Sequence, residues 1–552
     1  AVAAAAAGLT LAGCGGGGGD TGSTTTTDNG AVAQGGTLTA AVAYETNNYL
    51  PPNNSSALAV GADWHVVEGL YELDMATYKP YAALAAGDPV EVSETEYEVT
   101  LRDGAKFSDG TDVKASDVVA SYERTVGAEG ALYLSMLDFI DSVEAKDDTT
   151  VTFKLAHPFS LVKERLALIK VVPESATDAD LTKQPVGSGP WMYQSISESA
   201  IEFVPNEHYT GSKPAKADTM HWDIIKDDTA RTTAMQSATV AVMENVPATV
   251  ADQLTGAGAA VESVQGFNLP FLMFNTKKAP FDDARVRQAF FYAIDVNKLI
   301  SNAMSGLAAP VKSFLPEDHA NFHEASTVYE QNADMAKRLL EEAGVTTIDC
   351  TLDTTDASWI KDLSPSIKED LGKVGINVTI QEQASAALYS NRCDTDEEVQ
   401  PFDVVLAPGD PTVFGNDPDL LMNWWYGDNS WTQKRSSWKG SAEYEQLHEL
   451  MSQAVETTGS EQQELWNRCF DIIAEQVPLY PLFHRQMTTA YYESSRCAIP
   501  EHRTHVLRYN RKRPVSLRCG AGRFLARRAE SPRGRRVPRK GRSPRTRERR
   551  TW

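Results

Sequence analysis

The chain of 552 residues lacks the patterns that most enzymes and membrane proteins carry. After Cys14 no run approaches the roughly 18 apolar residues of a spanning helix, so we expect none there. VGSGP at 186–190 is not a nucleophile elbow, because a proline spoils the required turn. GAGAAV at 256–261 follows a helical pattern instead of the strand that a dinucleotide loop needs. The sequence therefore predicts no catalytic residue and no cofactor.

Histidine and cysteine are also scarce. His319 and His323 lie four residues apart and could share a helical face that binds zinc or nickel. No further Cys or His pair is near, so we interpret them as surface histidines and predict no metal site. Setting aside Cys14 and two cysteines of the C-terminal segment leaves Cys350, Cys393 and Cys469. An exported protein could pair two of these three, and the sequence does not choose the pair.

Positive charge is nearly confined to one end. Residues 496–552 hold 20 Lys+Arg and 3 Asp+Glu, which leaves 32 basic and 72 acidic residues, a net charge of −40, for 1–495. This acidic body has no electrostatic reason to bind nucleic acid. The basic segment lacks apolar periodicity, so we predict a disordered tail. A frameshift in GC-rich DNA is the favoured origin of the tail, and binding of nucleic acid or anionic lipid is the alternative.

The amino terminus predicts export. A short apolar run reaches Leu11-Ala12-Gly13-Cys14 and then gives way to Gly, Ser, Thr and Asp, as at a signal-peptide cleavage site. The basic start of such a signal is missing, so we expect that the chain is truncated at its front. The four residues resemble the lipobox of bacterial lipoproteins, in which the cysteine carries diacylglycerol. We expect Cys14 to be lipidated, 15–36 to be a flexible tether, and the protein to sit on the outer face of the cell membrane.

Strand and helix patterns alternate from Gly36 onward, which predicts an α/β protein. A helix should begin near Ser116 with Asp117 in its first turn, and another should be capped by Asp282 or Asp283. Gly344 and Gly375 should end two further helices. By contrast, 407–431 (APGDPTVFGNDPDLLMNWWYGDNSW) shows neither period and reads as an aromatic loop, which we expect to line a ligand cleft.

Several blocks in a fixed order resemble the extracytoplasmic solute-binding proteins of the peptide/nickel ABC-transporter family. They include YEVTLRDGAKFSDGTDVKASDVVASYERT, PVGSGPWMY and FLMFNTKKAPFDDARVRQAFFYAID, and the match covers about 37–495. The resemblance implies a two-lobed periplasmic-binding-protein-like fold (type II, cluster C) that binds its ligand by hinge closure without chemistry on it. The implied segments are a signal remnant with lipobox at 1–14, the tether at 15–36, lobe I at 37–75, 187–268 and 478–495, an extra subdomain at 76–186, lobe II at 269–477, and the tail at 496–552.

The resemblance also implies a ligand-binding set. We expect it to comprise Tyr44, Glu45, Asn47, Tyr71, Tyr133, Trp191, Asn275, Asp410, Phe414, Asp417, Trp424 and Trp425. In peptide-binding relatives an aspartate in the aromatic segment pairs with the free amine of the peptide. Here Phe414 holds that position, just before the Asp417-Pro418-Asp419 step that matches the family, and Asp410 could substitute for the aspartate.

The partners implied are a peptide or similar solute, a membrane permease and its ATPase; we expect a monomer. Aromatic walls suit other ligands too, so a nickel chelate, an oligosaccharide or glutathione stays an alternative within the same fold. An exported hydrolase is the alternative from another class, and its signature would be a nucleophile with a base within reach.

Overall fold

The computed structural model describes residues 35–52, 54, 56–75, 77–127 and 133–492. They all fall within one compact unit, Ala33–Lys512. The predictions for Cys14, for most of the tether and for the tail at 496–552 lie outside the described residues. Among the helices that are described, none combines the length and the apolar character needed to cross a membrane.

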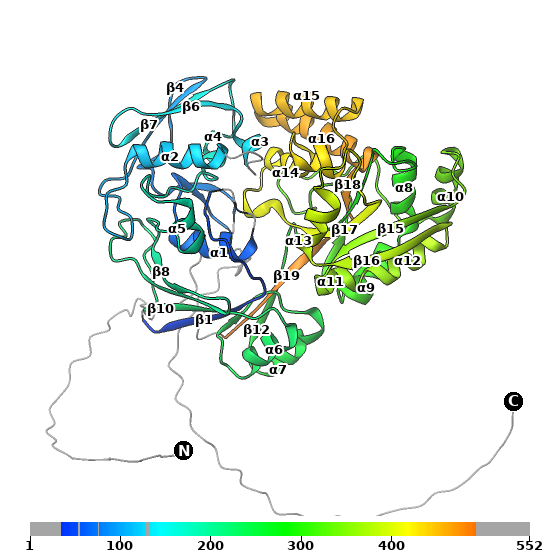
Figure 1. Cartoon of the computed structure of the whole chain (residues 1–552), viewed down its shortest axis with the longest axis horizontal. Coiled ribbons are helices and arrows are strands. Elements are labelled where there is room, and N and C mark those ends of the chain that lie inside the picture. Colours follow the sequence, from blue (N-terminus) through cyan, green and yellow to red (C-terminus); the bar gives the residue numbers. More distant parts are fainter. Residues whose placement is uncertain (1–34, 53, 55, 76, 128–132, 493–552) are drawn as a thin grey trace, which may run out of the picture. The chain divides into compact units, whose positions relative to one another are not determined.

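An eight-stranded sheet, here called the first sheet, contains the amino-terminal strand β1 (Figure 1). Its order is β12-β19-β11-β1-β10-β9-β8, with β14 paired to β19. The first sheet is mixed, because β1 runs parallel to β10 and β11 while the other pairs are antiparallel. The bounds are β1 Thr37–Val42, β8 Trp191–Ile196, β9 Ala200–Pro205, β10 Thr219–Ile224, β11 Val242–Met243, β12 Ala260–Gln265, β14 Ala308–Pro310 and β19 Phe483–Tyr491. Its helices are α1 Ala57–Val66, α5 Asp178–Lys183, α6 Asp228–Gln236 and α7 Ala251–Gly256.

A five-stranded sheet, here called the second sheet, has the order β16-β15-β17-β13-β18. Its strands are β13 Leu269–Phe274, β15 Ile348–Thr355, β16 Ile376–Gln383, β17 Val404–Gly409 and β18 Leu479–Pro481. The helices of this region are α8 Ala284–Ala293, α9 Val296–Ala303, α10 Ala333–Glu342, α11 Ser358–Lys361, α12 Ser364–Gly372, α13 Ser385–Leu388, α14 Pro418–Tyr426, α15 Ala442–Glu456 and α16 Gly459–Gln476. Because β18 pairs with β13, this sheet extends to Pro481, past the lobe boundary that we placed at 478.

A four-stranded antiparallel sheet, β4-β5-β7-β6, lies within the segment predicted as an extra subdomain. Its elements are β4 Val90–Ser93, β5 Glu96–Thr100, β6 Ile140–Ala145, β7 Thr150–Leu155, α2 Ala115–Val126, α3 Leu134–Leu137 and α4 Val162–Leu166. A hairpin of β2 Tyr71–Leu73 and β3 Pro80–Ala82 precedes them.

Capping residues in the sequence predicted several helix ends correctly. Asp283 caps α8 by accepting a hydrogen bond from the Arg285 amide at 2.8 Å, and the Asp117 carboxylate accepts one from the Lys114 amide at 2.8 Å at the start of α2. Gly344 and Gly375 follow α10 and α12 with φ of 74° and 90°, a left-handed conformation that glycine adopts without steric cost.

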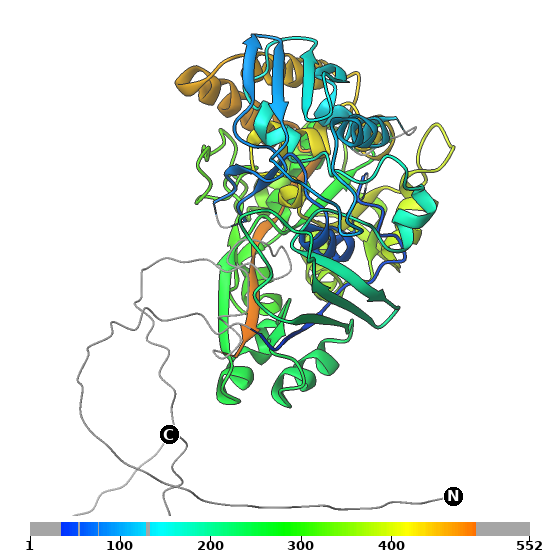
Figure 2. The ribbon, with the colours of Figure 1, turned by 90° about the vertical axis from the view of Figure 1, so that its left-hand side faces the viewer.

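Two of the short chain segments that connect the first and second sheets lie side by side. One joins β12 to β13 and the other joins β18 to β19, whose orange strand runs between the two regions in Figures 1 and 2. Backbone hydrogen bonds hold the segments together: the Arg485 amide donates to Asn268 O at 2.7 Å, and the Leu482 amide donates to Pro270 O at 2.9 Å. A pair of short adjacent crossings is a suitable place for a hinge.

The three cysteines considered for pairing are free and buried. Burial raises the pKa of the Cys350 and Cys393 thiols to about 12, so both are neutral at physiological pH. No disulfide joins Cys350, Cys393 or Cys469 in the structure.

Candidate ligand-binding site

Two cavities are lined by residues from both sheet regions. The Tyr133 cavity, of about 40 Å³, has Tyr133, Asp63 and Trp64 on one side and Val413 and Phe414 on the other. The Arg485 cavity, of about 170 Å³, is larger and more polar. Its lining comprises Asp228, Asn245, Val246, Pro247, Ala248, Thr249, Ala303, Met304, Leu307, Ser358, Trp359, Asp362, Arg485, Gln486 and Thr488.

Aromatic rings bridge the Tyr133 cavity. The ring of Tyr133 meets that of Phe414 edge to face, with centroids 5.2 Å apart, and Phe414 in turn lies 4.9 Å from Trp424. The Tyr133 hydroxyl donates to Asn54 O at 2.6 Å, so its polar tip is already satisfied. Tyr133, Phe414 and Trp424, predicted as wall residues, are thus in contact in a row that connects the subdomain with the second sheet region, and the first two line the cavity.

Tyr44, which follows β1, carries a hydroxyl whose pKa several charged groups affect. Its side chain is 36% exposed, yet burial raises the pKa of its hydroxyl to about 12 and Glu244 adds to the rise. Arg485 and Arg231 oppose this effect, whereas Asp410 adds to it. Tyr44 from the first sheet region therefore lies within electrostatic reach of Asp410, which follows β17 in the second.

Glu244 is a buried acid that acts electrostatically on the Tyr44 hydroxyl. Its exposed fraction is 4%, and its Oε2 has no hydrogen-bond partner among the described residues. Burial raises the pKa of Glu244 to about 8, although Arg231 opposes the shift. Its carboxyl group is therefore mostly protonated and neutral at pH 7.

Other predicted residues lie on the surface or in the core. Glu45 forms an exposed ion pair with Lys226 at 2.7 Å, and Asn47 is exposed. Tyr71, Trp191 and Asn275 are at most 2% exposed. Such buried side chains offer a ligand no surface in this structure.

The three buried residues have structural contacts. The Tyr71 hydroxyl donates to Gly87 O at 2.8 Å, and the Asn275 amide donates to Gln400 O at 2.8 Å. Trp191 belongs to the hydrophobic core of the first sheet.

The aromatic segment 407–431 is not the loop that we predicted, because α14 occupies Pro418–Tyr426. Asp417 caps this helix by accepting from the Leu420 amide at 2.9 Å, and Pro418 stands in its first turn. Both signals were present in the sequence, but the Gly, Pro and Asn around them obscured the helical period.

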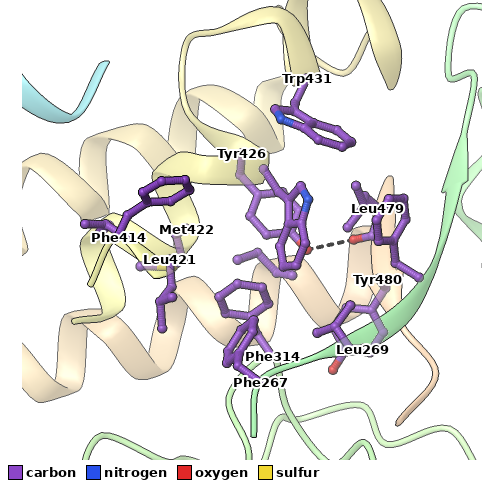
Figure 3. Close-up of a cluster of buried hydrophobic side chains, with 14 of the residues drawn as sticks. Phe267, Leu269, Phe314, Phe414, Leu421, Met422, Tyr426, Trp431, Leu479 and Tyr480 are labelled. Carbon is purple, nitrogen blue, oxygen red and sulfur yellow. Dashed lines mark hydrogen bonds between the residues drawn. The ribbon is translucent and has the colours of Figure 1, made fainter. Parts of the chain in front are cut away.

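Most of the aromatic surface of this segment packs inside the second sheet region. In Figure 3 the ring of Tyr426 lies beside that of Phe314, with centroids 5.6 Å apart, and the Tyr426 hydroxyl donates to Leu479 O at 2.7 Å. Trp425 is 1% exposed and packs against the rings of Phe267, Phe271, Phe314 and Trp431. Core packing, rather than a ligand wall, thus accounts for most of these rings.

Asp417 serves a buried ion cluster that the sequence did not reveal. Arg165 of α4, with a side chain 0% exposed, donates to Asp417 at 2.6 and 2.9 Å and to Asp419 at 2.5 Å. Burial opposes the charge of Arg165, but the two carboxylates raise its pKa above the ordinary value. The cluster ties the subdomain to α14. The only signal in the sequence was an arginine inside the apolar stretch LVKERLALI.

The two histidines weighed as metal ligands have separate partners. His319 donates from Nε2 to Asn416 O at 2.7 Å, and His323 lies 3.3 Å from an Asp471 carboxylate oxygen. Across the described ranges no group of three or more His, Cys, Asp or Glu residues is arranged to hold a metal ion.

Comparison with known proteins agrees with this architecture. The family "Bacterial extracellular solute-binding proteins, family 5 Middle" matches residues 79–443. The probable D,D-dipeptide-binding periplasmic protein DdpA of Escherichia coli K12 is 26% identical over 360 residues, which are 62% of this chain and 67% of that protein. The dipeptide-binding protein of the same organism is 27% identical over 306 residues, 50% of this chain and 57% of that protein. The chain thus spans little more than half of some curated relatives.

Two solved structures share the fold. DppA from Helicobacter pylori in complex with peptide STSA gives a TM-score of 0.74 at 21% identity, covering 84% of this chain and 94% of that one. NikA from Staphylococcus aureus in complex with Ni(L-His)2 gives 0.71 at 20% identity, covering 83% and 95%. With a family match over 79–443 and this two-lobed fold, the chain belongs to the bacterial extracellular solute-binding proteins of family 5, which are transport proteins and not enzymes.

Proposed function

We propose that the chain is the lipid-anchored, extracytoplasmic receptor of an ABC importer, and that it captures a peptide-like solute and delivers it to a permease. The observation that carries this proposal is the Arg485 cavity, which is lined from both sheet regions and lies beside the paired crossings. Family membership and the peptide complex of a similar fold support it. ATP would be used by the partner ATPase.

Hinge closure supplies the mechanism. A solute that touches both regions favours the closed arrangement by the difference between its affinities for the closed and open forms. Micromolar capture corresponds to about −8 kcal/mol, a value that a few aromatic contacts and main-chain hydrogen bonds supply after ordering costs. Because Tyr44 and Asp410 belong to different sheet regions, a solute between these two side chains contacts both regions.

The residues divide into two roles in this account. Asp410 would receive an ammonium group beside Tyr44, since its Oδ1 accepts from Thr412 while the other oxygen has no hydrogen bond within the described chain. Tyr133, Phe414 and Trp424 would provide an apolar wall. We retain lobe I at 37–75 and 187–268 and the subdomain at 76–186 as proposals.

The solute can be identified directly. The full chain is purified without denaturation, then denatured, and the released small molecules are analysed by mass spectrometry against a sample denatured and washed beforehand. Peptides in the first sample alone are the expected result. Release of a nickel chelate, a sugar or glutathione would support the receptor function but with a different ligand. Turnover of a peptide pool by the intact protein would contradict the receptor account.

Anchoring rests on Cys14 and is tested separately. Cells that produce the chain behind a complete signal sequence are fractionated, with Cys14→Ser as the variant. Lipid attachment predicts that the wild type stays with membranes and the variant is released. Equal partition of both proteins would contradict the anchor and leave solute capture untouched.

A further inference from the structure

Arg485 is a cation without an acidic partner in the Arg485 cavity. It stands on β19 directly after the chain crosses from the second sheet. Its Nη2 donates to Asn245 Oδ1 at 2.9 Å, and its guanidinium lies 4.9 Å above the ring of Trp359. Among the described residues, Nη1 of Arg485 has no hydrogen-bond partner, and none of their carboxylates forms an ion pair with this arginine.

Neither neighbouring acid forms an ion pair with Arg485, although Asp228 raises its pKa and opposes the lowering that burial causes. Asp228 forms an ion pair with Arg231 and accepts a hydrogen bond from Ser358 Oγ at 3.4 Å. Glu244 has a pKa of about 8 because it is buried, so it is mostly neutral at pH 7. Leaving a donor of a half-buried guanidinium unmatched is unfavourable, and charge-assisted hydrogen bonds are among the stronger ones available to it.

The surroundings fix the orientation of the guanidinium. Asn245 holds one nitrogen and the Trp359 ring supports the flat face, so the guanidinium keeps one direction for a planar partner. The cavity of about 170 Å³ has room for about six water molecules at roughly 30 Å³ each. That volume suits one end of a small solute rather than a whole extended peptide.

We propose that Arg485 binds a carboxylate group of the transported solute, such as the free carboxyl end of a short peptide. This inference rests on the proposed function and assigns the charge that its ligand must carry. A single negative charge fits better than a phosphate dianion, because Asp228 and Asp362 also line the cavity and would repel the second charge.

The first test compares matched peptides. Equimolar tripeptides with free carboxyl ends and their C-terminal amides are offered to the full chain, and retained species are quantified by mass spectrometry. We expect the wild type to retain the acids at least tenfold over the amides, and Arg485→Gln to lose roughly 10- to 100-fold in affinity for the acids alone, as expected for a lost charged hydrogen bond. Arg338→Gln, at a side chain 60% exposed, is the control that should match the wild type.

Arg485→Lys keeps the charge but not the planar fork, so an intermediate preference is expected. Arg485→Lys also replaces Arg485→Gln in the comparison if the glutamine variant does not fold. Melting curves of both variants show whether each is folded. A preference for acids that survives in Arg485→Gln, or equal retention of acids and amides by the wild type, would overturn the assignment to Arg485. Peptides bound without that preference would leave the receptor function standing.

A second measurement needs no peptide. Sodium acetate is titrated into the full chain while tryptophan fluorescence is recorded, with sodium chloride at matched ionic strength as reference. A saturable change is expected in the wild type and in Arg338→Gln, but not in Arg485→Gln or Trp359→Phe. Absence of any saturable change in the wild type, or the same change in Arg485→Gln, would overturn the carboxylate site even if peptides fail to bind.

Discussion

The buried cluster of Arg165, Asp417 and Asp419 leads to the most quantitative prediction. Its side chains are 0%, 12% and 8% exposed, so water cannot compensate for the loss of the arginine. Replacing Arg165 by methionine leaves two carboxylates buried without a counter-charge, and removing one partner of a buried ion pair costs about 3–5 kcal/mol. We expect a decrease of that size in the free energy of unfolding, measured by urea denaturation with tryptophan fluorescence.

Two comparisons make this prediction specific. The triple variant Arg165→Met, Asp417→Asn, Asp419→Asn removes all three charges and keeps an asparagine able to cap α14, so we expect it to regain most of the loss. Arg285→Met breaks an exposed pair with Asp283 and should cost at most about 1 kcal/mol. A cost below about 1 kcal/mol for Arg165→Met, or no recovery in the triple variant, would refute the reasoning.

Three further predictions concern other parts of the molecule. The pKa of Glu244 is about 8 in the folded protein against 4.5 ordinarily, so the free energy of unfolding should fall as pH rises from about 4.5 to 8. In Glu244→Gln this fall, measured by urea denaturation, should be smaller by a few kcal/mol, and an unchanged fall would contradict the prediction. Trp424→Ala, at a half-buried ring beside Phe414, should weaken solute binding about tenfold at a smaller stability cost than Trp425→Ala, which should cost about 3–5 kcal/mol in unfolding free energy; the reverse pattern would exchange their roles. Deleting 496–552 should leave solute affinity within about twofold by calorimetry, and loss of binding would show that the tail takes part.

Features encoded by neighbouring residues were predictable from the sequence. The cap at Asp283 and the glycines 344 and 375 were placed correctly, because a helix end depends on a few adjacent residues. The α/β class and the family followed from ordered blocks of sequence. The α14 helix was missed because its cap, Asp417, and Pro418 were interpreted as loop residues.

The site was less predictable, because burial depends on distant contacts. Trp424 and Trp425 are adjacent, yet one reaches the wall at Phe414 and the other is buried in the core. The helical period distinguishes the half-buried from the buried tryptophan only when the bounds of the helix are already known. Arg485 drew no attention in the sequence, since its surroundings come from Asn245 and Trp359, far away along the chain.

Movement of the two sheet regions around a solute is the central claim, and a distance measurement tests it most directly. Spin labels are attached through Glu198→Cys and Lys368→Cys, two exposed positions in the first and second sheet regions, in a chain whose Cys14, Cys497 and Cys519 are replaced by serine. The other native cysteines are buried. Double electron–electron resonance is recorded before and after adding the solute identified by mass spectrometry. A shorter, narrower distance distribution with bound solute is predicted. An unchanged distribution at saturating solute would contradict capture by hinge closure.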